Sequence, residues 1–207
     1  MKLSDFIPKY SERQLVARQY IGKKSACKTA AVGNIIFYGG AKAGGKSHLS
    51  LYSAVECCLK YKNLTVCIIR KDAPQLERWF IPEFLSNIPR SLYKWSARSR
   101  TAVFKGTNSR LEFLGIDKDA DMIRIKGIGY SYIIIDEANA YEVRSIEMAR
   151  GSLRNAKQTD FIPTMLMTGN PGERSDLWFK RHFINPQYEY LSKGDSEFNR
   201  ERFVFVP

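Results

Sequence analysis

The sequence predicts an α/β fold with a mostly parallel central sheet flanked by helices, and its apolar runs and helical segments carry this prediction. Buried parallel strands appear in a sequence as short, almost continuous apolar runs. Four such runs occur, at 34–38, 64–70, 130–138 and 163–171. Helix-like segments separate most of them, the alternation that builds βαβ units. A chain of 207 residues with 44% apolar content suits one such domain.

The segments between the strands have the apolar spacing of helices. Helices are expected at about 46–61, 74–86 and 142–154, with a shorter one at 176–183. A β-rich stretch with a turn at 105–110 precedes the third strand. The final residues are apolar and strand-like, so the natural chain is expected to continue beyond Pro207.

Charge and hydropathy limit the class of protein. Thirty-three Lys and Arg against 21 Asp and Glu leave a net charge of +12, which favours a polyanionic partner without separating DNA from RNA or an acidic membrane. A signal-peptide core and an apolar run of about 18 to 20 residues are both missing, so a soluble, intracellular protein without a membrane partner is expected.

The cysteines show no spacing typical of a metal site or a redox pair. The chain has four, Cys27, Cys57, Cys58 and Cys67, and they contain no CxxC motif. We expect reduced, buried thiols.

The stretch GAKAGGKS, residues 40–47, fits the phosphate-binding pattern G-x-x-x-x-G-K-[ST] and lies between a strand and a helix. Glycines let such a loop curl until its N–H groups and the helix N-terminus point at phosphates. Lys46 is expected to reach the β- and γ-phosphates and Ser47 to ligate Mg²⁺. A glycine-rich turn with a solvated lysine is the alternative. The predicted nucleotide-binding residues of the loop are Gly40, Ala41, Lys42, Ala43, Gly44, Gly45, Lys46 and Ser47.

An acidic pair ends the third apolar strand. Asp136 and Glu137 are costly there unless they meet a cation, and Asp136 is placed to hold Mg²⁺. Glu137 is placed to polarise the water that attacks the γ-phosphate. The alternative is a carboxylate pair that caps the next helix. The sequence has no Asn-Lys-x-Asp motif, which argues against guanine nucleotides.

A third polar motif ends the fourth strand, where Thr168, Gly169 and Asn170 precede Pro171. Ligands of parallel sheets bind at the carboxyl ends of the strands, so Asn170 is expected near the γ-phosphate, in a catalytic role in which its amide senses phosphate or holds the attacking water. An ordinary Asn-Pro turn is the alternative.

These motifs, in this order, indicate a P-loop NTPase of the ASCE or RecA-like type. The sequence resembles the ATPase domain of the large terminase subunit, the DNA-packaging motor of tailed bacteriophages. The resemblance covers nearly the whole chain and is carried by FYGGAKAGGKS, FKGTNSRLEFLG, YSYIIIDEANAYE, RGSLRN and TGNPGERSDLWFKRHFI. It implies an ATPase domain across residues 1–207, with 1–33 as an extension on the adenine side.

The resemblance also implies roles for single residues. Gln14, with Gln19 as second choice, matches a glutamine that reads adenine in the family; an exposed helix glutamine is the alternative. Lys42 stands where the family often has an arginine, and its ammonium lacks the guanidinium fork, which puts a cis finger role in doubt. The stretch 168–170 matches the motif that couples hydrolysis to domain motion.

Motors of this family resemble ring ATPases in which one subunit donates an arginine to the site of its neighbour. Arg124 is the first candidate for this catalytic role; Lys126, Arg150 and Arg154 compete with it, and a solvated surface arginine is the alternative.

A calcium site is excluded in the stretch DKDADMIR. Asp117, Asp119 and Asp121 alternate as in an EF-hand loop, but Met122 and Ile128 stand where glycine and glutamate are needed. A solvated loop is expected instead.

Basic residues recur from Arg90 to Arg100, with Tyr93 and Trp95 among them. This stretch suits either contact with a DNA backbone or a connector whose aromatic side chains enter the core.

The resemblance implies a Mg²⁺-dependent ATPase that drives double-stranded DNA into a procapsid without sequence preference. Its implied partners are the portal, the small terminase subunit and further copies in a ring, although an isolated domain can be a monomer. It would work in the host cytoplasm, docked on the procapsid, and be absent from the mature virion. No acidic cluster follows residue 176, so the nuclease domain of the family is expected to be missing from this chain.

Two alternatives to the motor are an ATP-dependent switch or loader acting on nucleic acid and a helicase-like ATPase. A switch would hydrolyse ATP slowly whatever the protein concentration or DNA. A helicase needs a second motor domain, which the remaining length cannot supply.

Overall fold

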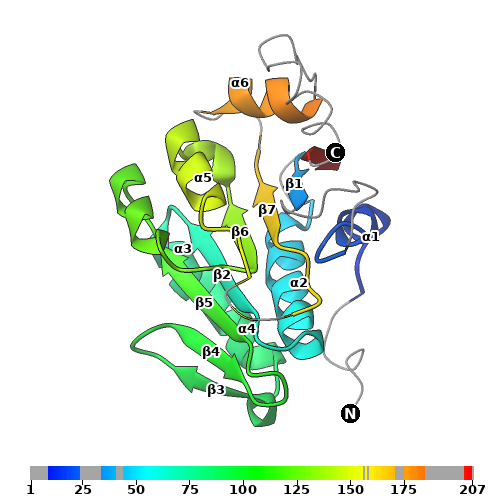
Figure 1. Cartoon of the computed structure of the whole chain (residues 1–207), viewed down its shortest axis with the longest axis vertical. Coiled ribbons are helices and arrows are strands. Elements are labelled where there is room, and N and C mark those ends of the chain that lie inside the picture. The colour runs from blue at the N-terminus through cyan, green and yellow to red at the C-terminus, as the bar shows by residue number, and fades with distance from the viewer. Residues whose placement is uncertain are drawn as a thin grey trace.

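The structure is a computed structural model that describes residues 9–23, 34–40, 44–155, 157, 159–170, 175–184 and 203–206. Within these residues the centre of the molecule is an eight-stranded sheet in the order β3-β4-β5-β2-β6-β7-β1-β8 (Figure 1). Six neighbouring strands, from β5 to β8 in that order, pair in parallel, and β3 and β4 add an antiparallel edge beside β5.

The strands are β1 (Asn34–Tyr38), β2 (Thr65–Arg70), β3 (Tyr93–Ser96), β4 (Thr101–Phe104), β5 (Arg110–Gly115), β6 (Tyr132–Asp136), β7 (Thr164–Thr168) and β8 (Phe203–Val206). The α-helices are α1 (Glu12–Arg18), α2 (Lys46–Lys60), α3 (Ala73–Gln75), α4 (Ile81–Asn87), α5 (Val143–Arg150) and α6 (Asp176–Phe179). Shorter 3-10 turns are η3 (Arg90–Leu92), η4 (Asp119–Ile125) and η5 (Ala138–Ala140), and π-helical turns are η2 (Leu76–Phe80) and η6 (Lys180–Ile184).

The strand order confirms the predicted fold class. β7 lies between the strand that leads into the phosphate loop, β1, and the strand that ends in the acidic pair, β6. All three strands run parallel, so their carboxyl ends meet at one edge of the sheet.

Both faces of the sheet are covered, which explains the almost continuous apolar strands. One face packs against α2 and α4, with Ile36 and Phe84 in that cluster. The opposite face packs against η4, α5 and α6, with Ile35 and Phe179 in that cluster. Successive strand residues therefore enter different cores.

Two helix predictions need correction. The helix expected at 74–86 contains a π-helical turn just before Pro82, because proline has no N–H to continue the regular ladder, and Ile81 N–H donates to Leu76 O instead. The helix expected to reach residue 154 ends at Arg150. Beyond it the chain pairs with Tyr130, whose N–H donates to Ser152 O.

The basic stretch 90–100 forms η3 and the strand β3, and its aromatic side chains enter the core. Tyr93 is 3% exposed, and its ring centroid lies 4.6 Å from that of Phe84. Trp95 packs on Phe84 and Phe113. The connector interpretation therefore holds for the aromatic side chains, whereas contact of the basic side chains with a DNA backbone stays a prediction.

The described cysteines are buried free thiols, as expected. Burial raises the pKa of the thiols of Cys57, Cys58 and Cys67, and Cys27 lies outside the described residues. No helix in the described part of the chain is long and apolar enough to cross a bilayer.

Replacing Phe84 with alanine should destabilise the domain strongly, because this ring joins α4 to four other aromatic rings in the core. We expect the free energy of unfolding to fall by about 3–5 kcal/mol, measured by urea denaturation. Ile123→Ala is the matched control: its side chain is 57% exposed, and its cost should stay within about 0.5 kcal/mol. A similar cost for both variants would contradict the packing described.

Candidate nucleotide-binding site

The phosphate loop closes onto the start of α2. Gly45 caps this helix with φ 70°, a left-handed conformation that favours glycine. Tyr38 Oη donates to Gly44 O at 3.1 Å, and Lys46 Nζ donates to Gly40 O at 3.1 Å. These bonds hold the described parts of the loop around the lysine. Ala41, Lys42 and Ala43 lie outside the described residues.

Lys46 is partly buried, and burial lowers the pKa of its ammonium. The carboxylates of Asp136 and Glu137 oppose this shift. A buried ammonium gains most from an anion in contact with it. The environment of Lys46 is therefore suited to a phosphate.

The acidic strand meets the phosphate loop through Asp136. This residue is 1% exposed, and its carboxylate accepts from Ser47 Oγ at 3.2 Å and from Thr168 Oγ1 at 2.6 Å. Glu137 N–H donates to the same threonine hydroxyl at 3.2 Å. The loop, the acidic strand and the coupling strand are thus joined at one carboxylate.

This cluster fits a magnesium ion. Hydroxyl and carboxylate oxygens are the ligands that Mg²⁺ takes from proteins, and Mg²⁺ commonly completes its shell with water and substrate phosphates. No group of three or more His, Cys, Asp or Glu within the described residues could hold a metal. Ser47 and Asp136 supply one hydroxyl and one carboxylate of this kind, and water and phosphate would supply the other ligands.

Arg70 is a site residue that the sequence analysis missed. It ends β2 directly beside Asp136 in the sheet register and is 6% exposed. Its guanidinium pairs with the carboxylate of Asp136 and, at 2.8 Å, with that of Glu137. It also donates to Gln75 Oε1. A single buried cation therefore holds both acidic side chains.

Glu137 has an unusual backbone conformation, with φ 54° and ψ 48° in the left-handed region. Left-handed conformations are uncommon outside glycine and cluster at functional sites. The side chain of Glu137 is 42% exposed, whereas that of Asp136 is almost fully enclosed. The two carboxylates have environments suited to different tasks, the buried one to a metal and the open one to a water molecule.

Gln14 lies against the phosphate loop. Its Nε2 donates to Gly45 O at 2.8 Å, and its Oε1 accepts from Ser11 N in the capping box of α1. It is 4% exposed, so the alternative of an exposed helix glutamine is wrong for this residue.

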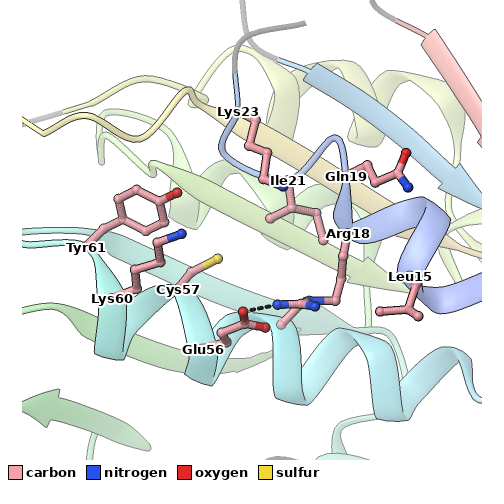
Figure 2. A pocket seen from close by; sticks show the side chains of 10 residues that line it. Leu15, Arg18, Gln19, Ile21, Lys23, Glu56, Cys57, Lys60 and Tyr61 are labelled. Carbon is pink, nitrogen blue, oxygen red and sulfur yellow. Dashed lines mark hydrogen bonds and ion pairs between the residues drawn. The ribbon is translucent and has the colours of Figure 1, made fainter. Parts of the chain in front are cut away.

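Gln19 lies elsewhere, in a cavity of about 340 Å³ between α1 and α2 (Figure 2). Glu56 and Lys60 line the same cavity, and Glu56 pairs there with Arg18 (Figure 2). At about 1.5 Å per residue, Glu56 is roughly 15 Å along α2 from Lys46. This cavity is therefore distinct from the phosphate site.

The coupling motif lies at the same edge of the sheet. Gly169 is closely packed, since a Cβ there would come within 2.7 Å of Asn139 Oδ1. Asn170 O accepts from Asn139 Nδ2, while Asn170 Oδ1 is buried without a hydrogen-bond partner in the described part of the chain. Asn139, a second site residue missed by the sequence analysis, thus lies against two of the three coupling residues, Gly169 and Asn170.

The candidate arginines differ in their surroundings. Arg150 pairs with Glu147 at 3.0 Å, and Arg154 donates to Gly127 O at 2.9 Å. Arg124 lies exposed on η4 and, within the described residues, has no ion pair; Lys126 is also exposed. Of these three arginines, Arg124 is therefore the most available for contact with another subunit.

The aspartate stretch is more than a solvated loop, because Asp119 ties η4 to α5. Its carboxylate accepts from Glu142 N and from Ser145 Oγ, both at 2.8 Å, and lies 3.4 Å from Lys71 Nζ. Burial alone would raise the pKa of Asp119, but these bonds and the lysine lower it overall. The turn that carries Arg124 is thereby attached to the segment after the acidic pair.

Replacing Arg70 with methionine should destabilise the nucleotide-free protein, because the buried carboxylate of Asp136 would lose its cation. We expect a loss of about 3–5 kcal/mol in the free energy of unfolding, measured by urea denaturation. Arg100→Met provides the control, since the Arg100–Glu77 pair is exposed and its loss should cost about 0–1 kcal/mol. A cost for Arg70→Met as small as the control would show that the buried pair does not carry the predicted energy.

Comparison with solved structures gives the same fold. The large terminase of a thermophilic bacteriophage has a TM-score of 0.63 and 18% identity, covering 96% of this chain and 45% of that chain. The HK97 bacteriophage large terminase gives 0.63 and 11%, covering 98% and 42%. The ATPase domain of the Thermus phage P74-26 large terminase gives 0.61 and 12%, covering 98% and 82%. The chain thus spans less than half of the first two proteins and most of the isolated domain.

Structures of the thermophilic phage protein have been solved in complex with ADP and with ATP-gamma-S. A comparison with curated proteins gives no match. The model of the family described as phage terminase large subunit matches residues 33–204, which is most of the sequence. The chain therefore belongs to the phage terminase large subunit family.

Proposed function

We propose that this chain is the ATPase domain of a phage DNA-packaging motor, which binds ATP with Mg²⁺ and hydrolyses it to move double-stranded DNA into a procapsid. The observation that carries the proposal is the contact of Asp136 with Ser47 of the phosphate loop and Thr168 of the coupling strand. Nucleotide complexes of the thermophilic phage terminase support ATP as the ligand.

Each site residue has a task in this proposal. The loop N–H groups and Lys46 hold the phosphates, and Gln14 lies on the adenine side. Ser47 and Asp136 would hold Mg²⁺, which neutralises charge on the phosphate oxygens when bound. Glu137 orients the attacking water and accepts its proton. Arg70 sets the orientation of the two carboxylates from the end of β2.

Asn170 and its neighbours would pass the change at the phosphate end to the rest of the motor. Arg124, exposed on η4, is the proposed finger that completes the site of a neighbouring subunit in a ring. The proposed assembly includes the portal and the small terminase subunit, docked on the procapsid in the host cytoplasm. The excess of 12 positive charges suits DNA held through its phosphates without sequence preference.

Nuclease activity is not part of the proposed function. Cleavage of linear duplex DNA by the purified chain in the presence of Mg²⁺ would contradict this.

Glu137→Gln should abolish hydrolysis while leaving nucleotide binding. The amide cannot accept the proton of the water, and a general base commonly contributes about 10²–10⁴-fold to the rate. The measurement is phosphate release together with fluorescent-ATP titration. Glu142→Gln, an exposed glutamate on the same segment, should keep wild-type turnover. Hydrolysis by Glu137→Gln at the wild-type rate would remove Glu137 from the proposed mechanism.

The specific ATPase rate should rise with protein concentration and with linear duplex DNA, because a neighbour supplies Arg124. Arg124→Ala should remove this rise without weakening nucleotide binding, and a loss of about 10³-fold is expected from a missing finger at full assembly. Arg144→Ala changes another exposed arginine, on α5, and should behave as wild type. A slow rate independent of concentration and DNA would favour the nucleotide-dependent switch instead.

A further inference from the structure

The 3-10 turn η5, directly after the acidic pair, is attached to the start of α6 by two buried side chains, that of Asn139 and that of Ser175, whose Oγ donates to Tyr141 O. Asn139 is 1% exposed, and its Nδ2 donates to Asn170 O and, at 2.9 Å, to Asp176 Oδ1. In the opposite direction Ser175 N–H donates to Asn139 O at 3.0 Å. The acidic segment, the coupling motif and the start of α6 therefore share one asparagine.

The shared asparagine sits in a tight environment. A Cβ on Gly169 would come within 2.7 Å of its Oδ1 and within 3.0 Å of Phe37 Cε2. The coupling backbone at Gly169 thus lies directly on the Asn139 amide, without space between them. A displacement of the coupling backbone must move the amide or break its contacts, because packed interiors do not deform continuously.

The second attachment of α6 is apolar and leads to the phosphate loop. The ring centroids of Phe179, in α6, and Phe183, in the η6 turn that follows it, lie 4.4 Å and 5.4 Å from that of Phe37. Phe37 belongs to β1, three residues before Gly40, where the loop begins. α6 lies beyond the carboxyl end of β7 (Figure 1). It therefore touches the strand of the phosphate loop and the segment of the acidic pair at the same time.

The side-chain amide of Asn139 forms hydrogen bonds through its nitrogen but, among the described residues, none through its oxygen. Its Oδ1 and that of Asn170 are buried without a hydrogen-bond partner in the described residues. Burying an acceptor without a donor lowers stability, so such an atom calls for an explanation. The oxygen of Asn139 therefore costs stability, whereas its nitrogen donates to Asn170 O and to Asp176. We attribute the presence of an asparagine here to those two donated hydrogen bonds.

We propose that Asn139 is a positioning residue that makes α6 follow the nucleotide state of the acidic segment. Nucleotide at the phosphate loop changes the partners of Asp136 and Glu137, and the adjoining η5 turn passes that change through the Asn139 amide to α6. This inference rests on the proposed function, because it requires nucleotide binding at the site. It adds a mechanical link that the phosphate, acidic and coupling motifs do not contain.

Trp178 on α6 is a built-in reporter of this link. Its ring stacks on His182, with centroids 4.3 Å apart. The two other tryptophans, Trp79 and Trp95, lie in η2 and β3. Fluorotryptophan labelling should give one fluorine NMR signal for each tryptophan, assigned by single Trp→Phe variants. Trp95, which is anchored in the core, serves as the internal reference.

Titration with ATP-gamma-S and Mg²⁺ should shift the Trp178 signal of the wild-type chain far more than the Trp95 signal. In Asn139→Ala the shift at Trp178 should be mostly lost, while nucleotide affinity changes by less than about tenfold. Asp176→Ala removes the same bond from the half-buried α6 side and should have the same effect. It keeps the test open should Asn139→Ala fail to fold.

The matched control is Asn155→Ala. Asn155 also donates through Nδ2 to a carbonyl, Phe161 O at 2.8 Å, and also has a buried Oδ1 without a partner among the described residues. It makes no bond to α6, so the Trp178 shift should be kept. A rescue adds specificity: Asn139→Asp should lose the shift, and combining it with Asp176→Asn should restore part of it, since donor and acceptor are exchanged.

The outcomes separate this inference from the proposed function. A Trp178 shift in Asn139→Ala equal to that of the wild type overturns the inference alone. So does a wild-type chain that binds the nucleotide, by independent fluorescence titration, without moving Trp178. A wild-type chain that binds no nucleotide overturns the proposed function and this inference together.

Discussion

The buried carboxylate of Asp136 is the constraint on which the rest of the site depends. A charge that is 1% exposed is tolerated only with opposite charge and hydrogen bonds around it. The sheet register places Arg70 directly beside it on β2, and β7 brings Thr168 from the other side. Ser47 reaches it from the start of α2. A shift of β2 by one residue would turn Arg70 to the opposite face of the sheet and leave the charge uncompensated.

The segment after β6 connects the acidic pair to two other parts of the domain. On one side Asp119 binds the N–H of Glu142 and the hydroxyl of Ser145, so the turn that carries Arg124 is fastened to it. On the other side Asn139 binds α6. The turn with the proposed intersubunit arginine and the helix proposed to move are thus attached to the same few residues. In the proposed mechanism, a change at the acidic pair would reach both a neighbouring subunit and α6 through these residues.

The strands, the phosphate loop and the acidic pair were predictable because each has a local sequence pattern, either an apolar run or a fixed spacing of residue types. Arg70 was not, since a single arginine at a strand end has no local mark and its role comes from pairing between strands far apart in the chain. Asn139 was missed because its role comes from contacts with Asn170 and Asp176, which lie far from it in the sequence. The overextended helix beyond Arg150 shows the converse: local periodicity favoured a helix, but pairing with Tyr130 offered the backbone other partners.

Charge at the described site supports the proposal that a neighbouring subunit supplies an arginine. Arg70 and Lys46 balance Asp136 and Glu137, so the four groups sum to zero before any nucleotide binds. A nucleotide with its Mg²⁺ would still bring net negative charge, which in the transition state is spread over the oxygens of the transferred phosphoryl group. Arg70 cannot neutralise this charge, because moving it to the phosphates would leave the buried carboxylate of Asp136 without its cation. Arg124 is exposed and has no ion pair in the described part of the chain, so moving it leaves no buried charge uncompensated there. From this separation of one buried and one exposed arginine, we propose that full activity depends on assembly.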